Sequence, residues 1–360
     1  MFSKNINVDD SQNRIRIKDI AKKAGVSIGT VDRVLHDRGE VSVETRKKVL
    51  RILDELDYKP NIIASTLASN KEHHFAVLIP EAPSEEAYWS KPLAGVKRAF
   101  TDFYQYGVRV DVYQFLSNNP DSFQDKADEI LNTQPEGVVM APFFLKESRT
   151  FVTELDERKI PYVFIDSSLK ETNKISYIGQ NSFQCGTLAA RLIDLAAPGP
   201  GNILVVHFAK KMDNQNHLVQ RENGFYDYFI RNDLRDQKRL VTIEVEDTSE
   251  ERFYPQMNYY MERLGSVRGI FVTNSKVYLM AEYIKKRNLP PIRLIGNDLV
   301  VQNVAWLKAG VVDFLICQRP EEQGYKAIES LFNHVLLKKT VSEENFTSID
   351  IITKENIDFY

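Results

Sequence analysis

Five polar residues have the types and positions expected of a site that recognises a ligand rich in hydroxyl groups. Four directly follow short apolar runs and one begins the helical stretch RENGF; they are Asp166, Asn274, Asp298 and Gln318, and Arg221. Carboxylates accept hydrogen bonds from neighbouring hydroxyls, whereas arginine and amide groups donate hydrogen bonds to ring and hydroxyl oxygens. Any one of the five could instead cap a helix or lie in a loop, so their joint placement matters.

The elements that must position these residues alternate along the chain. From Phe75 onward, short runs rich in β-branched residues, such as FAVLIP, YVFID and NILVVHF, are separated by longer stretches with helical periodicity. This alternation predicts parallel sheets with helices on both faces, and the chain is long enough for two such lobes. The segment PGPGN, at 198–202, marks a turn before the second lobe. Ligands bind beyond the carboxyl ends of parallel strands, so we expect the five polar residues to converge in a cleft.

Two aromatic residues follow the first predicted strand. Tyr88 and Trp89 lie in the loop after FAVLIP, where a ring face could pack against the apolar face of a sugar. The same exposed aromatic loop could instead serve contacts between subunits. We therefore include both residues in the predicted ligand site and leave the second role open.

A separate pattern near the beginning of the chain predicts two short helices joined by a tight turn. Gly25 marks the turn, and Ser27 is placed to cap the second helix. Apolar residues recur at helical spacing in the run 17–35: Ile17, Ile20 and Ala21, then Val31, Val34 and Leu35. The arrangement is typical of a helix-turn-helix, whose second helix lies in the DNA major groove, although an ordinary helical hairpin shows the same bare pattern.

A third helix follows from Ser42, a good N-cap, with Glu44 in its first turn, where the helix dipole favours an anion. Its predicted buried stripe is Val49, Leu50, Ile52, Leu53 and Leu56. Pro60 ends this element, and Asn61 can cap a short fourth segment that ends near Ala68.

These motifs together resemble the LacI/GalR (lac-repressor) family of transcription regulators. The matching pattern is I-K-D-I-A-x-x-A-G-V-S-x-x-T-V-x-R-V-L, then V-S-x-x-T-R-x-x-V, then L-x-Y-x-P-N-x-x-A-x-x-L. It covers the first fifth of the chain densely. The stretches F-I-D, R-E-N-G-F, G-N-D and Q-R-P-x-x-x-G, within 75–325, resemble the sugar site of the periplasmic-binding-protein-like domain that this family shares with sugar-binding proteins.

The resemblance implies roles within the DNA-binding module. Arg33 is the best candidate for a bidentate contact to a guanine edge, with a solvated surface arginine as the alternative. Ile28 and Gly29 lie where family members commonly read bases, although Gly29 has no side chain for the purpose. Ser27, Thr30 and His36 could reach phosphates, which position the protein without conveying sequence. Asp32 departs from the small neutral residue, usually serine, that relatives carry there, and its role is open.

The segment NIIASTL, 61–67, resembles the hinge helix of the family. The resemblance implies that this helix orders on operator binding and that a leucine from each of two subunits wedges into the minor groove. Leu67 matches that leucine, and Asn61 and Ala64 belong to the same DNA-binding segment. Two hinge helices side by side require a homodimer and a near-palindromic operator. An unremarkable interdomain linker is the alternative.

Composition agrees with a soluble intracellular regulator. The net charge is −3, yet the segment 14–48 carries ten basic and five acidic residues, a surplus that suits a polyanion such as DNA. No apolar run approaches the ~20 residues of a membrane span, and the first residues lack a signal-peptide pattern, so we expect a cytoplasmic protein. The two cysteines, Cys185 and Cys317, lack metal-ligand spacing, and neither a metal nor a cofactor is expected.

The predicted fold is an N-terminal all-α helix-turn-helix domain with a hinge helix, followed by a two-lobed α/β domain of the type I periplasmic-binding-protein-like class. The expected divisions are a disordered tail 1–13, a DNA-binding domain 14–60, a hinge and linker 61–73 and a ligand-binding and dimerisation domain 74–360. Within the last, one lobe spans about 74–178 with 320–347 and the other about 179–319 with 348–360.

The predicted function is regulation of carbohydrate-utilisation genes by a dimeric DNA-binding protein that acts as a repressor, with a monosaccharide-like effector in the cleft. An activator, or a co-repressor-dependent regulator with a non-sugar effector, is the alternative. A transport solute-binding protein would need an export signal and no DNA module. A sugar-modifying enzyme would need a paired acid and base; the sequence contains no G-x-x-x-x-G-K-[ST], H-E-x-x-H or G-x-S-x-G pattern, so no enzymatic activity is expected.

Overall fold

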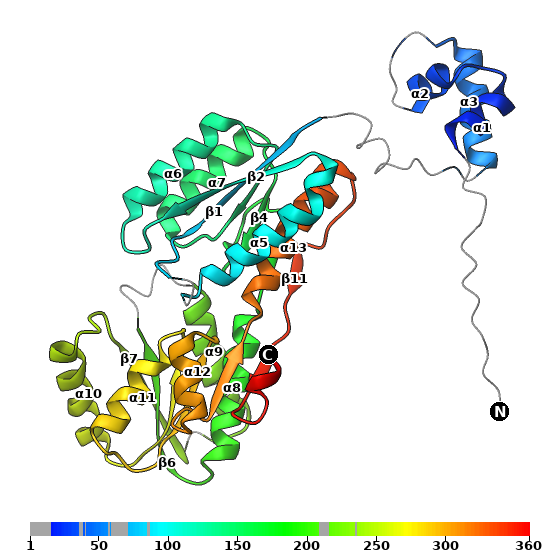
Figure 1. The fold of residues 1–360 in the computed structure, drawn as a ribbon. Helices are drawn as coiled ribbons and strands as arrows, with labels where there is room; N and C mark the ends of the chain where they lie inside the picture. Colours follow the sequence, from blue (N-terminus) through cyan, green and yellow to red (C-terminus); the bar gives the residue numbers. More distant parts are fainter. Residues whose placement is uncertain are drawn as a thin grey trace, which may run out of the picture. The chain divides into compact units, whose positions relative to one another are not determined.

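The chain divides into two units, Met1–Ser65 and Thr66–Tyr360 (Figure 1). The computed structural model describes residues 16–35, 39, 41–56, 58, 71–84, 87–208, 216–234 and 236–360.

The described part of the first unit consists of three helices around a small core. They are α1 (Ile17–Ala24), α2 (Ile28–Leu35) and α3 (Val43–Glu55). Gly25 joins α1 to α2 with φ of 67°, a left-handed conformation that glycine adopts without a steric penalty. The Ser27 hydroxyl accepts a hydrogen bond from the Thr30 N–H (3.1 Å), and Ser42 caps α3 through the Thr45 N–H (3.2 Å). Both predicted N-caps are therefore confirmed.

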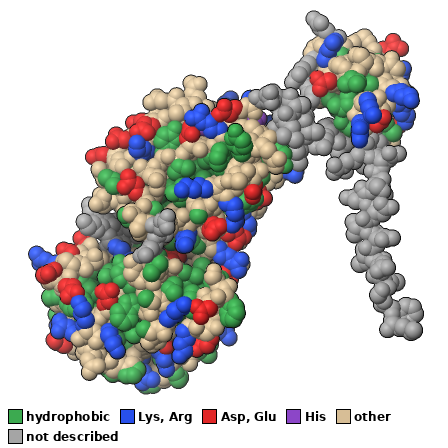
Figure 2. All heavy atoms as spheres, in the orientation of Figure 1, with side chains coloured by type: hydrophobic (Ala, Val, Ile, Leu, Met, Phe, Trp, Pro, Cys, Tyr) green, Lys and Arg blue, Asp and Glu red, His purple; other side chains and the backbone are tan. Residues whose placement is uncertain are grey.

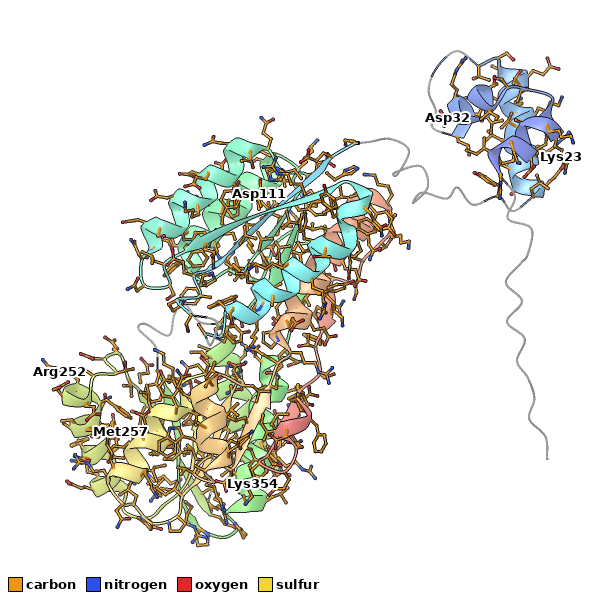
Figure 3. The ribbon with its side chains drawn as sticks, in the orientation of Figure 1. Lys23, Asp32, Asp111, Arg252, Met257 and Lys354 are labelled. Atoms are coloured by element: carbon orange, nitrogen blue, oxygen red, sulfur yellow. The ribbon has the colours of Figure 1, made fainter. Side chains whose placement is uncertain are left out.

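Apolar side chains from all three helices close this core. The buried residues are Ile20, Ala21, Ala24, Val31, Val34, Val49 and Ile52. A salt bridge of 3.2 Å between Lys23 and Glu55 joins the ends of α1 and α3 (Lys23 is labelled in Figure 3). The predicted burial of Leu50 is wrong, because this residue lies off the Val49–Ile52 stripe and is 49% exposed.

The second unit contains two six-stranded sheets with the same strand order, and each sheet is the centre of one lobe. The first-lobe sheet runs β11 (Glu344–Phe346), β5 (Ser176–Gly179), β4 (Tyr162–Ile165), β3 (Gly137–Met140), β1 (His73–Pro80) and β2 (Val108–Phe115). The second-lobe sheet runs β12 (Asp350–Ile352), β10 (Phe314–Cys317), β9 (Arg293–Asn297), β8 (Val267–Val272), β6 (Gly201–His207) and β7 (Lys238–Glu244). All paired strands are parallel except β12, which is antiparallel to β10. The chain leaves β11 at the carboxyl edge of the first-lobe sheet and enters the second-lobe sheet at the carboxyl edge of that sheet. β12 therefore runs away from the carboxyl edge, antiparallel to β10.

Helices cover both faces of each sheet, as strand–helix alternation predicts. The first lobe carries α5 (Ser90–Phe103), α6 (Pro120–Thr133), α7 (Leu145–Glu157) and α13 (Pro320–Leu331), with short helices at Tyr104–Tyr106 and Phe332–Leu336. The second carries α8 (Ser182–Ala196), α9 (Asn216–Arg231), α10 (Glu250–Leu264), α11 (Val277–Lys286) and α12 (Val301–Lys308), with a short helix at Ile357–Phe359. Alternate residues of β1 enter different cores: Phe75 and Val77 on one face, Ala76 and Leu78 on the other.

The chain crosses between the lobes three times, at Gly179–Ser182, Cys317–Pro320 and Phe346–Asp350. As a result, α8 follows a first-lobe strand but packs on α9, and α13 follows a second-lobe strand but packs on α5. Glycines bring each helix pair into backbone contact. A Cβ on Gly186 of α8 would lie 1.8 Å from the Arg221 carbonyl oxygen, and one on Gly224 of α9 would lie 1.9 Å from the Phe183 carbonyl oxygen. The backbone of α9 at Arg221 is thereby held against α8.

Candidate functional site

The two carboxylates of the predicted ligand site occupy equivalent positions in the two sheets. Asp166 directly follows β4 and Asp298 directly follows β9, and these strands hold the same place in their sheets. Both residues have left-handed backbone conformations, with φ of 66° and 71°. Such conformations are uncommon outside glycine, although aspartate tolerates them, and they cluster at functional sites. Each carboxylate is thus turned out of its strand at the carboxyl edge, where ligands of parallel sheets bind.

Arg221, in α9, is a buried cation, 2% exposed. Its Nη1 donates a hydrogen bond to the Thr273 carbonyl (2.6 Å), and its Nη2 lies 3.4 Å from Gln180 Oε1. The Nε atom is buried and has no hydrogen-bond partner. Arg221 forms no salt bridge among the described residues, although the charges of Asp166 and Asp298 act on it. A buried guanidinium balanced only at longer range is suited to bind the oxygens of a ligand.

Tyr88 contacts Asp166 through its hydroxyl group. The phenolic O–H donates a hydrogen bond to Asp166 Oδ1 (2.7 Å), and its pKa is raised well above the ordinary value by burial and by the charges of Asp166 and Asp298. Its ring meets Trp89 edge-on, and Trp89 packs on the first-lobe core. The structure therefore places the Tyr88 hydroxyl beside Asp166, and packing of the Tyr88 or Trp89 ring against a sugar stays a prediction.

Gln318 and Asp298 form a buried polar pair. Gln318 Nε2 donates a hydrogen bond to Asp298 Oδ1 (2.9 Å), and both residues are at most 5% exposed. Burial raises the pKa of Asp298 to about 6, against the opposing effects of Arg221 and of the Gln318 hydrogen bond. Tyr88 and Asp298 also line a common groove of about 1100 Å³, whose walls come from α5, α12 and α13.

Asn274 lies at the carboxyl end of β8, but its side chain is used within the second lobe. Its Nδ2 donates to the Phe208 carbonyl (2.8 Å), and its Oδ1 lies 3.3 Å from the Lys276 N–H. These bonds fix the loop between β8 and α11. A ligand contact by Asn274 stays a prediction.

Several residues of the site were not singled out from the sequence. His217 precedes Arg221 by one helical turn, its Nδ1 is buried without a partner, and burial lowers its pKa to about 4 despite the charge of Asp166. The four-residue spacing of His217 and Arg221, which places both on one helix face, is the sequence signal that could have identified His217 as a site residue. Gln323 was missed because its contact is far away in sequence: its Oε1 accepts a hydrogen bond from the Asp166 N–H (3.0 Å).

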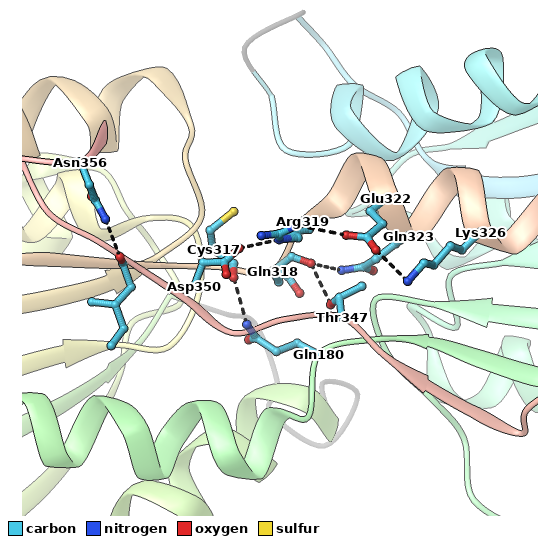
Figure 4. A network of polar contacts seen from close by, with 11 residues as sticks. Gln180, Cys317, Gln318, Arg319, Glu322, Gln323, Lys326, Thr347, Asp350 and Asn356 are labelled. Carbon is cyan, nitrogen blue, oxygen red and sulfur yellow. Dashed lines mark hydrogen bonds and ion pairs between the residues drawn. The ribbon is translucent and has the colours of Figure 1, made fainter. Parts of the chain in front are cut away.

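Amide side chains tie the crossing segments together (Figure 4). Gln180 Nε2 donates to the Cys317 carbonyl (3.3 Å), which joins the first crossing to the second. The Gln318 carbonyl accepts from Gln323 Nε2 (2.9 Å) and from the Thr347 hydroxyl (3.0 Å), which joins the second crossing to the third. The same glutamines contact Arg221 and Asp166, so the ligand site and the crossings share side chains.

In the helical unit, the predicted DNA-binding residues that the structure describes lie on or beside α2. Ser27, Ile28, Gly29 and Arg33 are exposed and Thr30 is partly exposed, whereas Val31 and Val34 face the core. Lysine and arginine side chains lie over the visible face of this unit (Figure 2), and Asp32 lies on α2 (labelled in Figure 3). His36, Asn61, Ala64 and Leu67, with the tail 1–13 and most of the segment 61–73, lie outside the described residues.

Two negative observations apply to the described part of the chain. No three histidine, cysteine, aspartate or glutamate side chains there are grouped so that they could hold a metal ion. No described helix is both long and apolar enough to cross a bilayer.

Comparisons with known proteins match both units. Residues 16–61 match the family model described as bacterial regulatory proteins, lacI family, and residues 75–339 match the periplasmic binding protein domain. A crystal structure assigned to the LacI transcriptional regulators, from Bacteroides fragilis, is 31% identical with a TM-score of 0.75, and the match covers 81% of this chain and 100% of that one. The chain belongs to the LacI family.

Curated relatives of this LacI-family chain include catabolite control protein A of Streptococcus mutans, 32% identical over 52% of this chain and 58% of the relative. HTH-type transcriptional regulator RegA of Clostridium saccharobutylicum is 31% identical over 43% of this chain and 44% of the relative. The chain thus spans about half the length of these relatives. GanP, a glucose-galactose binding protein from Geobacillus stearothermophilus, shares the two-lobed fold with a TM-score of 0.70 and 19% sequence identity. The match covers 80% of this chain and 99% of GanP.

The raised pKa of Asp298 predicts a pH dependence of stability. Because the folded state favours the protonated acid, this group contributes stability that is fully present below pH 3.8 and is lost as pH rises through about 6. Relative to Asp298→Asn, the free energy of unfolding of the wild-type protein should fall by about 2–3 kcal/mol between pH 4 and pH 7. Urea titrations followed by tryptophan fluorescence measure this unit alone, since both tryptophans, Trp89 and Trp306, belong to it.

The control is Glu157→Gln, which removes an exposed carboxylate of α7 in the same unit and should leave the wild-type pH profile unchanged. A pH profile of Asp298→Asn that is parallel to the wild-type profile would show that burial does not shift this carboxyl group.

Proposed function

We propose that this chain is a ligand-responsive, DNA-binding transcription regulator that represses genes of carbohydrate use. It acts in the cytoplasm as a homodimer on a near-palindromic operator, by binding rather than by catalysis, and a small sugar-like effector alters its affinity for DNA. The observation that carries the proposal is the combination, in one chain, of a helix-turn-helix whose second helix exposes Arg33 and a two-lobed domain whose two equivalent carboxylates act electrostatically on a buried arginine.

The DNA-binding part of the proposal rests on the two sides of α2. Val31 and Val34 attach the helix to the core, whereas Ile28, Gly29 and Arg33 are exposed and can enter a major groove. Of these three exposed residues, Arg33 is the one that can form a bidentate contact with guanine. Exposed Lys47 and Lys48 of α3 add positive charge for phosphate contacts.

The effector part rests on the chemistry of the cleft. Asp166 and Asp298 can accept hydrogen bonds from hydroxyls on opposite sides of one ligand, and Arg221 can donate to its oxygens. The cationic Arg221 is balanced by the two carboxyl groups, one of which has a raised pKa, so an uncharged ligand fits better than an anion. Solved proteins of the same fold are described as a glucose-galactose binding protein, an arabinose binding protein and a periplasmic ribose ABC transporter, and we propose a monosaccharide for this chain.

The regulatory part rests on the crossing segments. A ligand that binds Asp166 of the first lobe and Asp298 or Arg221 of the second favours one relative arrangement of the lobes. Gln180 and Gln323 contact both the site and the crossings, so a change at the site reaches these segments directly. We propose that the two lobe arrangements differ in whether the segments Asn61–Leu67 of a dimer can pair and insert Leu67 into the operator.

Arg33→Ala should weaken binding to an operator selected from random DNA by about 10- to 100-fold and relax the sequence preference at one base pair. Binding to non-specific DNA should change by less than threefold, since only one charge is lost. Arg51→Ala, which removes an exposed arginine of α3, is the matched control and should retain sequence preference. Mobility-shift titrations at two salt concentrations measure both affinities; equal losses on operator and random DNA would refute base reading by Arg33.

Monosaccharides should raise the melting temperature of the protein, because a ligand that binds only the folded state stabilises it. Asp166→Asn should lower the affinity for the most effective sugar by about 30-fold or more, because it removes a charged acceptor. Its operator affinity without sugar should stay unchanged. Calorimetry measures the sugar affinities, and Glu157→Gln is again the control variant. If no monosaccharide stabilises the protein but another compound does and depends on Asp166, the effector is not a sugar.

A further inference from the structure

One apolar residue of α2 has no role in the core of the helical unit. Ile28 is the first residue of this helix and is 56% exposed, whereas the other aliphatic residues of α2 are buried or pack against the core. Val43 and Leu50 are also exposed, but both belong to α3. Ile28 is therefore the exposed aliphatic side chain at the beginning of the helix whose N-terminal residues meet base edges in a helix-turn-helix complex.

The residue after Ile28 leaves the space beside it open. Gly29 has no side chain, and a Cβ built there would meet only Ser27 Oγ, at 3.8 Å. Arg33 follows Gly29 by one helical turn and is exposed on the same side. The base-facing beginning of α2 thus offers one branched aliphatic group, an open position and, one turn later, a guanidinium. The backbone of the helix can approach base edges closely at Gly29 without a side chain between them.

An aliphatic side chain cannot form hydrogen bonds with base edges, so its selectivity must come from apolar contact. In the major groove, guanine, cytosine and adenine present hydrogen-bonding groups, and thymine alone adds a methyl group at C5. Placing Ile28 against an amino group or a ring nitrogen would remove water from that group and return no hydrogen bond. Contact with the thymine methyl instead buries apolar surface on both partners.

We propose that Ile28 selects thymine at one position of each operator half-site by packing against its 5-methyl group. This inference rests on the proposed DNA-binding function and adds the chemical identity of one base that the helix reads. Arg33 then reads a guanine farther along the same groove, and Gly29 contributes no side chain to base reading.

The test uses the full chain and operators selected from a pool of random double-stranded DNA. Each thymine of the selected half-site is replaced in turn by deoxyuridine, which keeps the hydrogen-bonding groups and removes only the methyl. At one position the wild-type protein should lose about fourfold in affinity, the effect of one buried methyl group. Ile28→Ala should bind the thymine operator more weakly, and its affinities for the thymine and deoxyuridine operators should be equal.

Leu50→Ala is the matched control, because Leu50 is exposed to a similar degree in the same unit and should leave the fourfold discrimination intact. Circular dichroism confirms folding, which is expected for Ile28→Ala because the side chain lies outside the core. Selected operators without an invariant thymine, or a wild-type protein that binds every deoxyuridine operator as tightly as its parent, would overturn the inference while DNA binding stands. If selection yields no operator at all, both the inference about Ile28 and the proposed function fail.

Discussion

The buried charge of Arg221 is the feature on which the ligand-binding unit depends. A cation that is 2% exposed is costly unless surrounding groups stabilise it, and here the stabilisation comes from the Thr273 carbonyl, from Gln180 and from two carboxylates at longer range. The close contact of α8 with α9 at Gly186 fixes the backbone of Arg221 itself. Any bulkier residue at Gly186 would move the guanidinium away from these partners.

This arrangement explains how a small molecule could move whole lobes. Gln180 contacts Arg221 and the second crossing, and Gln323 contacts Asp166 and the carbonyl of Gln318. The groups that would bind a ligand are therefore one hydrogen bond away from the segments that connect the lobes. Packed interfaces of this kind switch between discrete arrangements rather than deform gradually, which suits regulation. The Tyr88 hydroxyl donates a hydrogen bond to one oxygen of Asp166, so a ligand that binds this carboxylate must share it with Tyr88 or displace Tyr88.

Much of the fold followed from the sequence, because alternating strands and helices and well-placed caps are local signals. Ser27 and Ser42 cap their helices as predicted, and Asp166, Asp298 and Gln318 follow their strands at the carboxyl edges. Contacts between distant segments could not be predicted this way. His73 and His74 pair with Glu136 (2.8 Å) and with Asp111 (3.0 Å; Asp111 is labelled in Figure 3), because neighbouring strands bring these carboxylates to the beginning of β1. The roles of Tyr88, His217 and Gln323 likewise depend on loop geometry and lobe crossings that periodicity does not encode.

The central claim is that the effector cleft and the operator-binding helices are energetically coupled. Coupling of this kind is reciprocal, so the operator must change the affinity for the sugar by the same factor that the sugar changes the affinity for the operator. Calorimetric titration of the most stabilising sugar into the full chain, with and without saturating operator, measures this directly. We predict dissociation constants that differ by about 5- to 150-fold, with weaker sugar binding in the presence of operator if the sugar relieves repression. Identical dissociation constants in the two titrations would contradict the claim.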